Sequence, residues 1–296
     1  MIKNRKYNHE SDYQKVNQLL YDSFVIDKYV NWIQPRWEYM HYHPILNKED
    51  YKLFKVWLDN DELVAVIHHE HRVGQAFLQV KDGYDYLKEE MIIHAENNLV
   101  GQKEGKKYLD FYCKEFDKVT INLLKQRGYT RIKEDSPWLI VTKLDPNEAQ
   151  LPNLSDEFEL IGLDKENNLA QVDRVLWPGF NHESEPDGDL TDRKLMQSPE
   201  NFNKYLNVVI KEKSSGNYVS YSGSWYDPNN KVGYIEPVAT DPDFRKKGLG
   251  KVAVLECVKR LKTLGAKTVY VESGIPFYLR IGFKPVFKYE VWHKEF

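Results

Sequence analysis

The chain has 296 residues, of which 41% are apolar and 29% are charged, a balance typical of globular proteins and a length that predicts two domains. The 42 Lys and Arg residues nearly match the 45 Asp and Glu residues, so a net charge of −3 excludes general attraction to polyanions and we expect no nucleic-acid partner. The N-terminus lacks the apolar core of a signal peptide, and no apolar stretch approaches the ~18 residues of a membrane helix, so we expect a cytoplasmic protein without a membrane partner. The chain has only two cysteines, Cys113 and Cys257, so we expect neither a disulfide framework nor a Cys-based zinc site.

The first half of the chain alternates helical and strand-like segments. The spacing of its apolar residues, together with turn signals such as Asp59-Asn-Asp-Glu62, predicts the type of each segment. In chain order we expect a strand at 3–7, helices at 11–24 and 28–41, strands at 53–58, 63–69 and 75–80, a helix at 86–99, a strand at 107–112 and a helix at 116–126.

A polar segment separates the two halves. Residues 144–157 contain two prolines and no apolar periodicity, and they follow a strand-like run at 138–144. Such a segment is typical of a linker. We therefore predict one domain over residues 1–145, a linker over residues 146–157 and a second domain over residues 158–296.

The second half repeats the order of the first. We expect strands at 157–163, 206–211, 218–226, 231–240, 268–272 and 283–293, with helices at 165–176, 199–205, 254–261 and 276–281. Two copies of one α+β layout, each a mixed, mostly antiparallel central sheet flanked by helices, is the economical prediction. Two unrelated domains of similar size are the alternative.

The segment after the strand that ends at Thr240 has the clearest chemistry. A turn with Pro242 leads to Arg245-Lys-Lys-Gly-Leu-Gly250, which opens a helix. Gly248 and Gly250 allow the backbone to approach an anion, and the start of a helix presents unpaired N–H groups with a positive dipole end. The side chains of Lys246, Lys247 and Lys251 add positive charge. The segment therefore predicts a cradle for a pyrophosphate.

Two other phosphate motifs fit this segment less well. A Walker loop needs Gly-Lys-Ser/Thr after a four-residue gap, which the segment lacks. The dinucleotide pattern G-x-G-x-x-A fits residues 248–253, and Glu272 lies at a tolerable distance. That fold, however, needs the first glycine directly at the end of a strand, and here residues 241–247 intervene. We therefore disfavour dinucleotide binding.

The same residues resemble the coenzyme A loop of the GNAT acetyltransferases. The family pattern is a strand, then V-x-P, then [Q/R]-x-x-G-x-[G/A] at the start of a helix, and this chain has Thr240-Asp-Pro242 followed by Arg245-x-x-Gly248-x-Gly250. Further on, Phe277-Tyr278-Leu-Arg-Ile-Gly282-Phe283 resembles the family's F-Y-x-x-x-G-F segment. The resemblance covers residues 218–288. It implies tandem GNAT-like domains, with acetyl-CoA as co-substrate of the second.

The resemblance also implies roles for individual residues. Tyr278 matches the family's general acid, and Glu236 lies where the family often places a general base. Because Pro237 has no N–H for a strand ladder, the N–H of Val238 is the candidate donor to the thioester oxygen. A core aromatic and a solvated carboxylate are the alternatives for Tyr278 and Glu236. The implied cofactor-binding residues are Val238, Ala239, Thr240, Arg245, Lys246, Lys247, Gly248, Leu249, Gly250, Lys251, Ser273 and Tyr278; no metal site is implied.

The first half resembles a degenerate copy. When residues 78–82 are laid over the strand end at Val238, Lys88 and Glu90 stand at the positions of the two glycines. Carboxylates crowd this turn and would repel a pyrophosphate. Laying residues 124–129 over 278–283 puts Leu124 in the place of the general acid. We therefore expect no cofactor in the first domain.

Two further features carry weaker predictions. His68-His-Glu-His71 is interpreted as an exposed strand end rather than a metal site, since alternate strand residues point to opposite faces. The acidic segment at 181–189 could steer a cationic amine, with a solvated acidic loop as the alternative.

The resemblance implies an N-acetyltransferase that acts on a small-molecule or peptide amine. Neither cysteine is placed for a covalent acyl intermediate, so we expect direct transfer in a ternary complex. A non-catalytic acyl-CoA-binding sensor or interaction protein on the same fold is the alternative. The sequence does not identify the acceptor or the oligomeric state.

Overall fold

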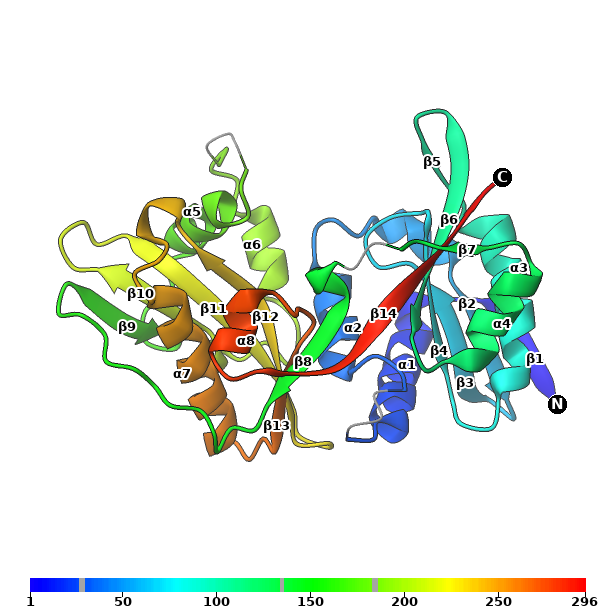
Figure 1. Cartoon of the computed structure of the whole chain (residues 1–296), viewed down its shortest axis with the longest axis horizontal. Coiled ribbons are helices and arrows are strands. Elements are labelled where there is room, and N and C mark those ends of the chain that lie inside the picture. The colour runs from blue at the N-terminus through cyan, green and yellow to red at the C-terminus, as the bar shows by residue number, and fades with distance from the viewer. Residues whose placement is uncertain (27–29, 134–135, 183–185) are drawn as a thin grey trace. The chain divides into compact units, whose positions relative to one another are not determined.

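The computed structural model describes residues 1–26, 30–133, 136–182 and 186–296, which divide into two units (Figure 1). Unit 1 comprises Met1–Ile140 and Val286–Phe296, and unit 2 comprises Val141–Pro285. The chain therefore passes from unit 1 to unit 2 and returns to unit 1 near its C-terminus.

Each half of the chain supplies a strand to the sheet of the other half. The C-terminal strand β14 (Lys284–Glu295) pairs with β6 (Lys106–Lys114) and completes unit 1. Strand β8 (Ile140–Leu144) ends the first half of the sequence and pairs with β13 (Thr268–Val271) in unit 2. The predicted boundaries at 145 and 158 differ from this division, because they follow the order of the chain and strand pairing does not.

Unit 1 is a mostly antiparallel sheet with helices on both faces. Its strand order is β1-β2-β3-β4-β6-β14, with β5 beside β6 and β7 beside β14. Strands β4 and β6 run parallel. The elements not yet given are β1 (Ile2–Lys6), α1 (His9–Ser23), α2 (Gln34–Tyr42), β2 (Lys55–Asp59), β3 (Glu62–His68), β4 (Gln75–Val80), α3 (Lys88–Asn98), β5 (Gly101–Lys103), α4 (Lys118–Gln126) and β7 (Thr130–Arg131).

The alternation of side chains along the central strands creates two cores in unit 1. On β3, Ile67 packs with Met91 and Leu124 from α3 and α4. The opposite face of β3 carries Val66, which packs with Leu20 of α1 in the second core. A strand that is apolar on both faces is covered by helices on both sides.

The histidines at the end of β3 are not exposed, which corrects the expectation for this segment. His68 and His69 are both 0% exposed. The Glu70 carboxylate accepts two hydrogen bonds of 2.8 Å from Arg36 of α2, so the helix covers the strand end and neutralises its charge. No group of three His, Cys, Asp or Glu residues that could hold a metal ion occurs in the described residues.

Unit 2 has a second mixed, mostly antiparallel sheet, as predicted for both domains. Its order is β8-β13-β12-β11-β10-β9, and β12 pairs in parallel with β13. This is not the doubly wound parallel sheet that dinucleotide binding requires. The elements not yet given are β9 (Phe158–Gly162), α5 (Leu169–Gly179), α6 (Thr191–Met196), β10 (Val208–Glu212), β11 (Tyr218–Asp227), β12 (Val232–Thr240), α7 (Leu249–Thr263) and α8 (Pro276–Arg280).

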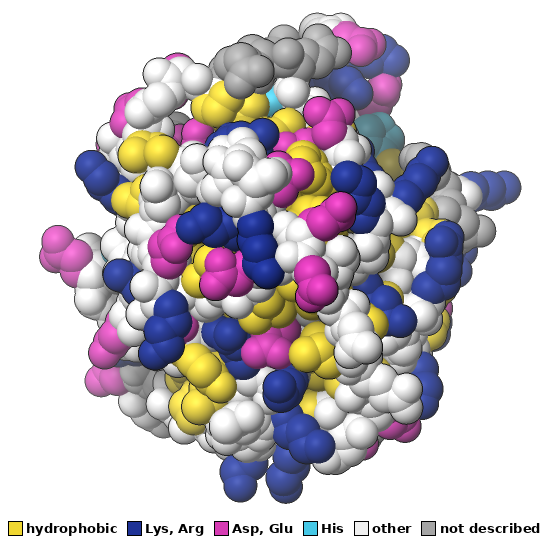
Figure 2. Space-filling model, turned by 90° about the vertical axis from the view of Figure 1, so that its left-hand side faces the viewer, with side chains coloured by type: hydrophobic (Ala, Val, Ile, Leu, Met, Phe, Trp, Pro, Cys, Tyr) yellow, Lys and Arg dark blue, Asp and Glu magenta, His cyan; other side chains and the backbone are white. Residues whose placement is uncertain are grey.

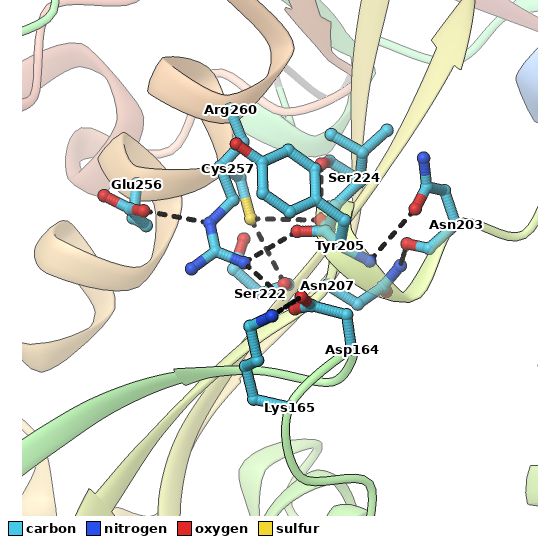
Figure 3. Close-up of polar contacts among 11 residues, drawn as sticks. Asp164, Lys165, Asn203, Tyr205, Asn207, Ser222, Ser224, Glu256, Cys257 and Arg260 are labelled. Carbon is cyan, nitrogen blue, oxygen red and sulfur yellow. Dashed lines mark hydrogen bonds and ion pairs between the residues drawn. The ribbon is translucent and has the colours of Figure 1, made fainter. Parts of the chain in front are cut away.

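Near its middle, helix α7 is held to strand β11 and to the turn before β10 (Figure 3). The guanidinium of Arg260 donates to the carbonyl of Tyr205 at 2.7 Å and to Glu256 at 2.9 Å. The Cys257 thiol donates to the carbonyl of Ser222 on β11 at 3.2 Å. Because a helix is rigid over this length, these contacts also fix the position at which α7 begins.

The face of unit 2 drawn in Figure 2 carries acidic and basic side chains interspersed with one another. Among the helices of the described ranges, none has the length and apolar character needed to cross a membrane.

Candidate active site

The two central strands of unit 2 separate before they end. Strand β12 pairs with β13 from Val232 to Tyr234, and beyond Tyr234 it continues to Thr240 paired with β11 alone. The backbone edge of β12 from residue 235 to 240 is therefore open on the side of β13.

A β-bulge bends β12 within this open stretch. Ser224 pairs with Ile235 and Ser222 with Val238, so Glu236 and Pro237 together face Gly223. A Cβ atom at Gly223 would lie 2.6 Å from the carbonyl oxygen of Glu236, which requires glycine there. Such a bulge changes the direction of a strand. It occurs directly before the predicted donor, Val238.

The pairing pattern determines which backbone groups face the open edge. Asp241 donates its N–H to the carbonyl of Val219 at 3.0 Å, so it belongs to a hydrogen-bonded pair with β11. Since such pairs alternate in an antiparallel ladder, Ala239 also faces β11, whereas the N–H and C=O of Val238 and Thr240 point away from it. The carbonyl of Thr240 accepts a hydrogen bond of 3.2 Å from Arg245. Val238 therefore presents a donor and an acceptor at the open edge.

The loop before α7 presents a row of backbone donors. Lys246 and Gly248 have φ angles of 64° and 81°, in the left-handed region. The first helical hydrogen bond of α7 runs from Val252 to the carbonyl of Gly248 at 3.2 Å. In the described part of the chain, no acceptor receives the backbone N–H groups of residues 246–251. These N–H groups lie at the positive end of the helix, where an anion is favoured, and we refer to them below as the cradle.

The side chains around this cradle have different surroundings. Nothing lies within 4 Å of a Cβ placed at Gly248, so the cradle is open there. A Cβ at Gly250 would lie 3.1 Å from the Thr240 hydroxyl, which makes that position tight. The Leu249 side chain is 2% exposed in the core, so only its backbone reaches the loop surface. The Lys247 ammonium lies 4.6 Å from the ring centre of Phe244.

The Arg245 side chain is engaged with the protein itself. Besides Thr240, its guanidinium donates to the carbonyl of Gly179 and to the Asn181 side chain, each at 3.0 Å. Arg245 therefore joins the end of β12 to the end of α5. These contacts give it a structural role, and its contact with a cofactor stays a prediction.

The two predicted catalytic residues lie within electrostatic range of each other. Tyr278 lies on α8 with 6% of its surface exposed, and the ring of Phe283 packs edge-on against it at 5.6 Å. Burial, and secondly the negative charge of Glu236, raise the pKa of the Tyr278 hydroxyl. The hydroxyl is therefore protonated at neutral pH, as a general acid must be.

The Ser273 hydroxyl and carbonyl both have hydrogen-bond partners within the chain. Ser273 is 4% exposed, and its hydroxyl accepts a hydrogen bond of 3.4 Å from the N–H of Ile275 at the start of α8. Its carbonyl accepts a hydrogen bond of 3.0 Å from Thr142 of β8. The predicted contact of Ser273 with a cofactor stays a prediction.

The acidic segment before α6 is described only in part. Residues 183–185, which include two of its carboxylates, lie outside the described residues. The carboxylate of Asp189 accepts the N–H of Thr191 at 2.8 Å, and Asp187 accepts the N–H of Asp189 at 2.9 Å. These two carboxylates therefore stabilise the local turn that leads into α6.

Sequence reasoning missed several residues that shape the site. Gly223 forms the bulge, and the indole of Trp225 donates to the carbonyl of Glu236 at 3.0 Å. Gly179 ends α5 against Ala239, where a Cβ would come within 2.6 Å. A glycine inside a strand pattern is a signal for a bulge, so Gly223 could have been found. The contact at Gly179 has no local signal.

Comparisons with known proteins agree with this geometry. Residues 169–283 match the family model described as "Acetyltransferase (GNAT) family". The glucosamine 6-phosphate N-acetyltransferase of Trypanosoma brucei brucei is 36% identical over 56 residues, which span 18% of this chain and only 38% of that enzyme.

Two solved structures share the fold over the whole chain. A tandem GNAT protein from the clavulanic acid biosynthesis pathway has a TM-score of 0.65 at 11% identity, with 100% of this chain and 98% of that chain covered. A GCN5-related N-acetyltransferase from Sphaerobacter thermophilus has a TM-score of 0.60 at 16% identity, with 99% and 95% covered. Residues 169–283 thus match the acetyltransferase (GNAT) family, and the chain has the fold of a tandem GNAT protein.

Proposed function

We propose that unit 2 transfers an acetyl group from acetyl-CoA to an amine acceptor, by direct transfer in a ternary complex. The observation that carries this proposal is the open edge of β12, followed after a short turn by the N–H groups of residues 246–251 at the start of α7. An extended arm can pair with such an edge, and a pyrophosphate at its far end can accept hydrogen bonds from the loop. The residues present fit a coenzyme A thioester.

The backbone supplies most of the proposed cofactor contacts. The N–H of Val238 donates to the thioester oxygen and polarises the carbonyl, while Ala239 and Thr240 continue the edge along which the arm lies. Gly248, Leu249 and Gly250 donate backbone N–H groups to the pyrophosphate. The side chains of Lys246, Lys247 and Lys251 neutralise its charge, and Ser273 and Tyr278 border the arm near the thiol.

The proposed chemistry needs a base for the amine and an acid for the thiolate. Glu236 accepts a proton from the ammonium form of the acceptor, directly or through a water molecule, so that the amine nitrogen can attack the carbonyl carbon. The C–S bond breaks, the Tyr278 hydroxyl gives its proton to the sulfur, and the second proton that the nitrogen loses as the amide forms passes to the Tyr278 oxygen. Glu236 belongs to β12 and Tyr278 to α8.

Direct transfer is supported by the state of both cysteines. Cys113 and Cys257 are buried. Burial raises the pKa of the Cys257 thiol to about 11, and it raises that of Cys113 as well. A thiol that keeps its proton is a poor nucleophile at neutral pH.

The test is thiol release from acetyl-CoA in the presence of single amines. The panel includes glucosamine 6-phosphate, because the relative matched over part of its length is named for this substrate. It also includes simple alkyl amines, lysine and a peptide with a free N-terminus. We expect thiol release well above the rate without amine for at least one class. Tight acetyl-CoA binding with no release for any amine would favour the non-catalytic sensor.

A further inference from the structure

Unit 1 contains the same separation of strands that forms the open edge in unit 2. Strand β4 pairs in parallel with β6 only at Gln75 and Ala76, opposite Asp110 and Phe111, and beyond this point the two strands diverge. A cavity of about 320 Å³ lies at their ends, with Leu78 among its lining residues. The slot between β4 and β6 is thus the counterpart of the gap beside β12.

The last residue of β4 faces this slot with its backbone. Lys81 donates its N–H to the carbonyl of Val64 at 2.8 Å, so the pair next to it, Val80 with Ala65, points its backbone groups the other way. In unit 2, Asp241 likewise donates its N–H to the carbonyl of Val219, so the backbone groups of the neighbouring Thr240 point away from β11. Val80 is therefore the equivalent of Thr240.

The side chain of Asn31 occupies the edge at Val80. Its amide nitrogen donates to the carbonyl of Val80 at 2.9 Å, and its amide oxygen accepts the N–H of Val80 at 2.9 Å. Asn31 and Val80 are 4% and 5% exposed. The primary amide thus offers the strand one donor and one acceptor, as the amide of an extended cofactor arm would.

The neighbours of Asn31 hold it across the slot. The N–H of Trp32 donates to the side-chain oxygen of Gln79 on β4 at 2.8 Å. From the opposite strand, the ammonium of Lys114 on β6 donates to the carbonyl of Val30 at 2.6 Å. The segment of residues 30–32 therefore bridges the two diverging strands.

The end of the slot that corresponds to the pyrophosphate cradle of unit 2 is also closed. The Lys88 ammonium, at the start of α3, lies 2.8 Å from Asp85 and 2.9 Å from Asp117. The N–H of Lys88 donates to the carbonyl of Asp85, so the start of α3 is less open than that of α7. Two carboxylates stand where unit 2 presents free N–H groups and lysines, and they disfavour a pyrophosphate.

We infer that Asn31 acts as an internal substitute for the amide of a cofactor arm, so that unit 1 is closed to coenzyme A by its own chain. The inference rests on the proposed function only in assigning the remaining cofactor site to unit 2. Each chain then binds one coenzyme A, and the edge at Val80 stays occupied by residues 30–32.

Calorimetry with coenzyme A tests the stoichiometry. The wild-type chain is expected to bind one molecule, and Gly248→Asp, which puts a carboxylate into the cradle of unit 2, is expected to bind none. Two sites in the wild type, or one site remaining in Gly248→Asp, would overturn the inference. No binding by the wild type would refute the proposed function instead, and the role of Asn31 would then be decided by the second measurement.

Amide hydrogen exchange at Val80, followed by NMR of the whole chain, tests the contact itself. We expect a protected Val80 amide in the wild type and exchange at least about 10-fold faster in Asn31→Ala, because the acceptor is lost. Asn31→Asp keeps an acceptor oxygen and should retain most of the protection. The backbone amide of Gln79, which faces β3, is the internal control, and its exchange rate should not change. An unprotected Val80 amide in the wild type, or equal protection in Asn31→Ala, would contradict the inference.

Discussion

Acid is expected to destabilise unit 1 well before its carboxylates are protonated. Burial lowers the pKa of His68 to about 3 and that of His69 to about 4, and it holds the pKa of His41 well below its ordinary value of 6.5. The unfolded chain takes up protons as the pH falls through 6.5, whereas the folded unit does not. Stability that is fully present above pH 6.5 is therefore lost as the pH falls toward 4.

The expected loss is large compared with the stability of a domain. For each histidine that stays neutral in the folded unit, a drop from pH 7 to pH 5 favours the unfolded state by about 2 kcal/mol. His41 and His68 together then contribute about 4 kcal/mol. His69 adds less than its full share if its charged form pairs with Asp50, whose carboxylate lies 3.4 Å away. The total is therefore about 4–6 kcal/mol, against a typical 5–15 kcal/mol for a whole domain.

Urea unfolding at pH 7 and pH 5 measures this loss. Tryptophan fluorescence reports on unit 1, where Trp32, Trp37 and Trp57 are fully buried. In His68→Gln, the difference between the two pH values should shrink by about 2 kcal/mol, even if the variant is less stable at both. His182→Asn, at an exposed position of unit 2, is the matched control and should leave the difference unchanged. A wild-type difference below about 1 kcal/mol would refute the reasoning, because the buried histidines would then be titrating in the folded unit.

Three further predictions concern unit 2. Tyr278→Phe should lower turnover roughly 10- to 100-fold and leave acetyl-CoA affinity within about 3-fold, since only the acidic hydroxyl is lost; wild-type turnover would make Tyr278 a core aromatic. The double variant Lys246→Ala, Lys247→Ala should weaken coenzyme A binding about 10-fold at low salt and flatten its salt dependence in calorimetry; an unchanged salt dependence would remove these lysines from the site. Gly223→Ala should lower the free energy of unfolding of unit 2 by about 1–3 kcal/mol in urea, and an unaltered value would mean that the bulge can relax.

Part of the candidate site could be predicted from local sequence patterns. The loop at Arg245–Gly250 and the segment around Tyr278 combine residue types within a few positions, so the glycines and the aromatic residue indicated the chemistry without tertiary information. The mixed sheets could likewise be predicted, because turn signals and apolar alternation repeat in both halves.

Contacts between distant parts of the chain could not be predicted in this way. The pairing of Trp292 with Phe111 joins residues whose separation no local signal spans. The burial of His68 and His69 depends on α2, whose Arg36 neutralises Glu70 beside them. The two hydrogen bonds between the Asn31 amide and the backbone of Val80 could likewise not be predicted, because neither residue belongs to a motif. In each case the decisive partner lies far away in sequence.

The exchange of strands between the two halves sets the order in which the protein can be completed during synthesis. Residues 106–114 leave the ribosome early, yet their partner strand, β14, follows all of unit 2. The edge of β6 therefore waits without β14 while about half of the chain is still being made. An unpaired edge is a template for pairing with other chains, so the edge of β6 is open to such pairing until β14 has been made. Cutting the chain at the linker would separate β14 from unit 1, and the N-terminal fragment would keep that open edge permanently.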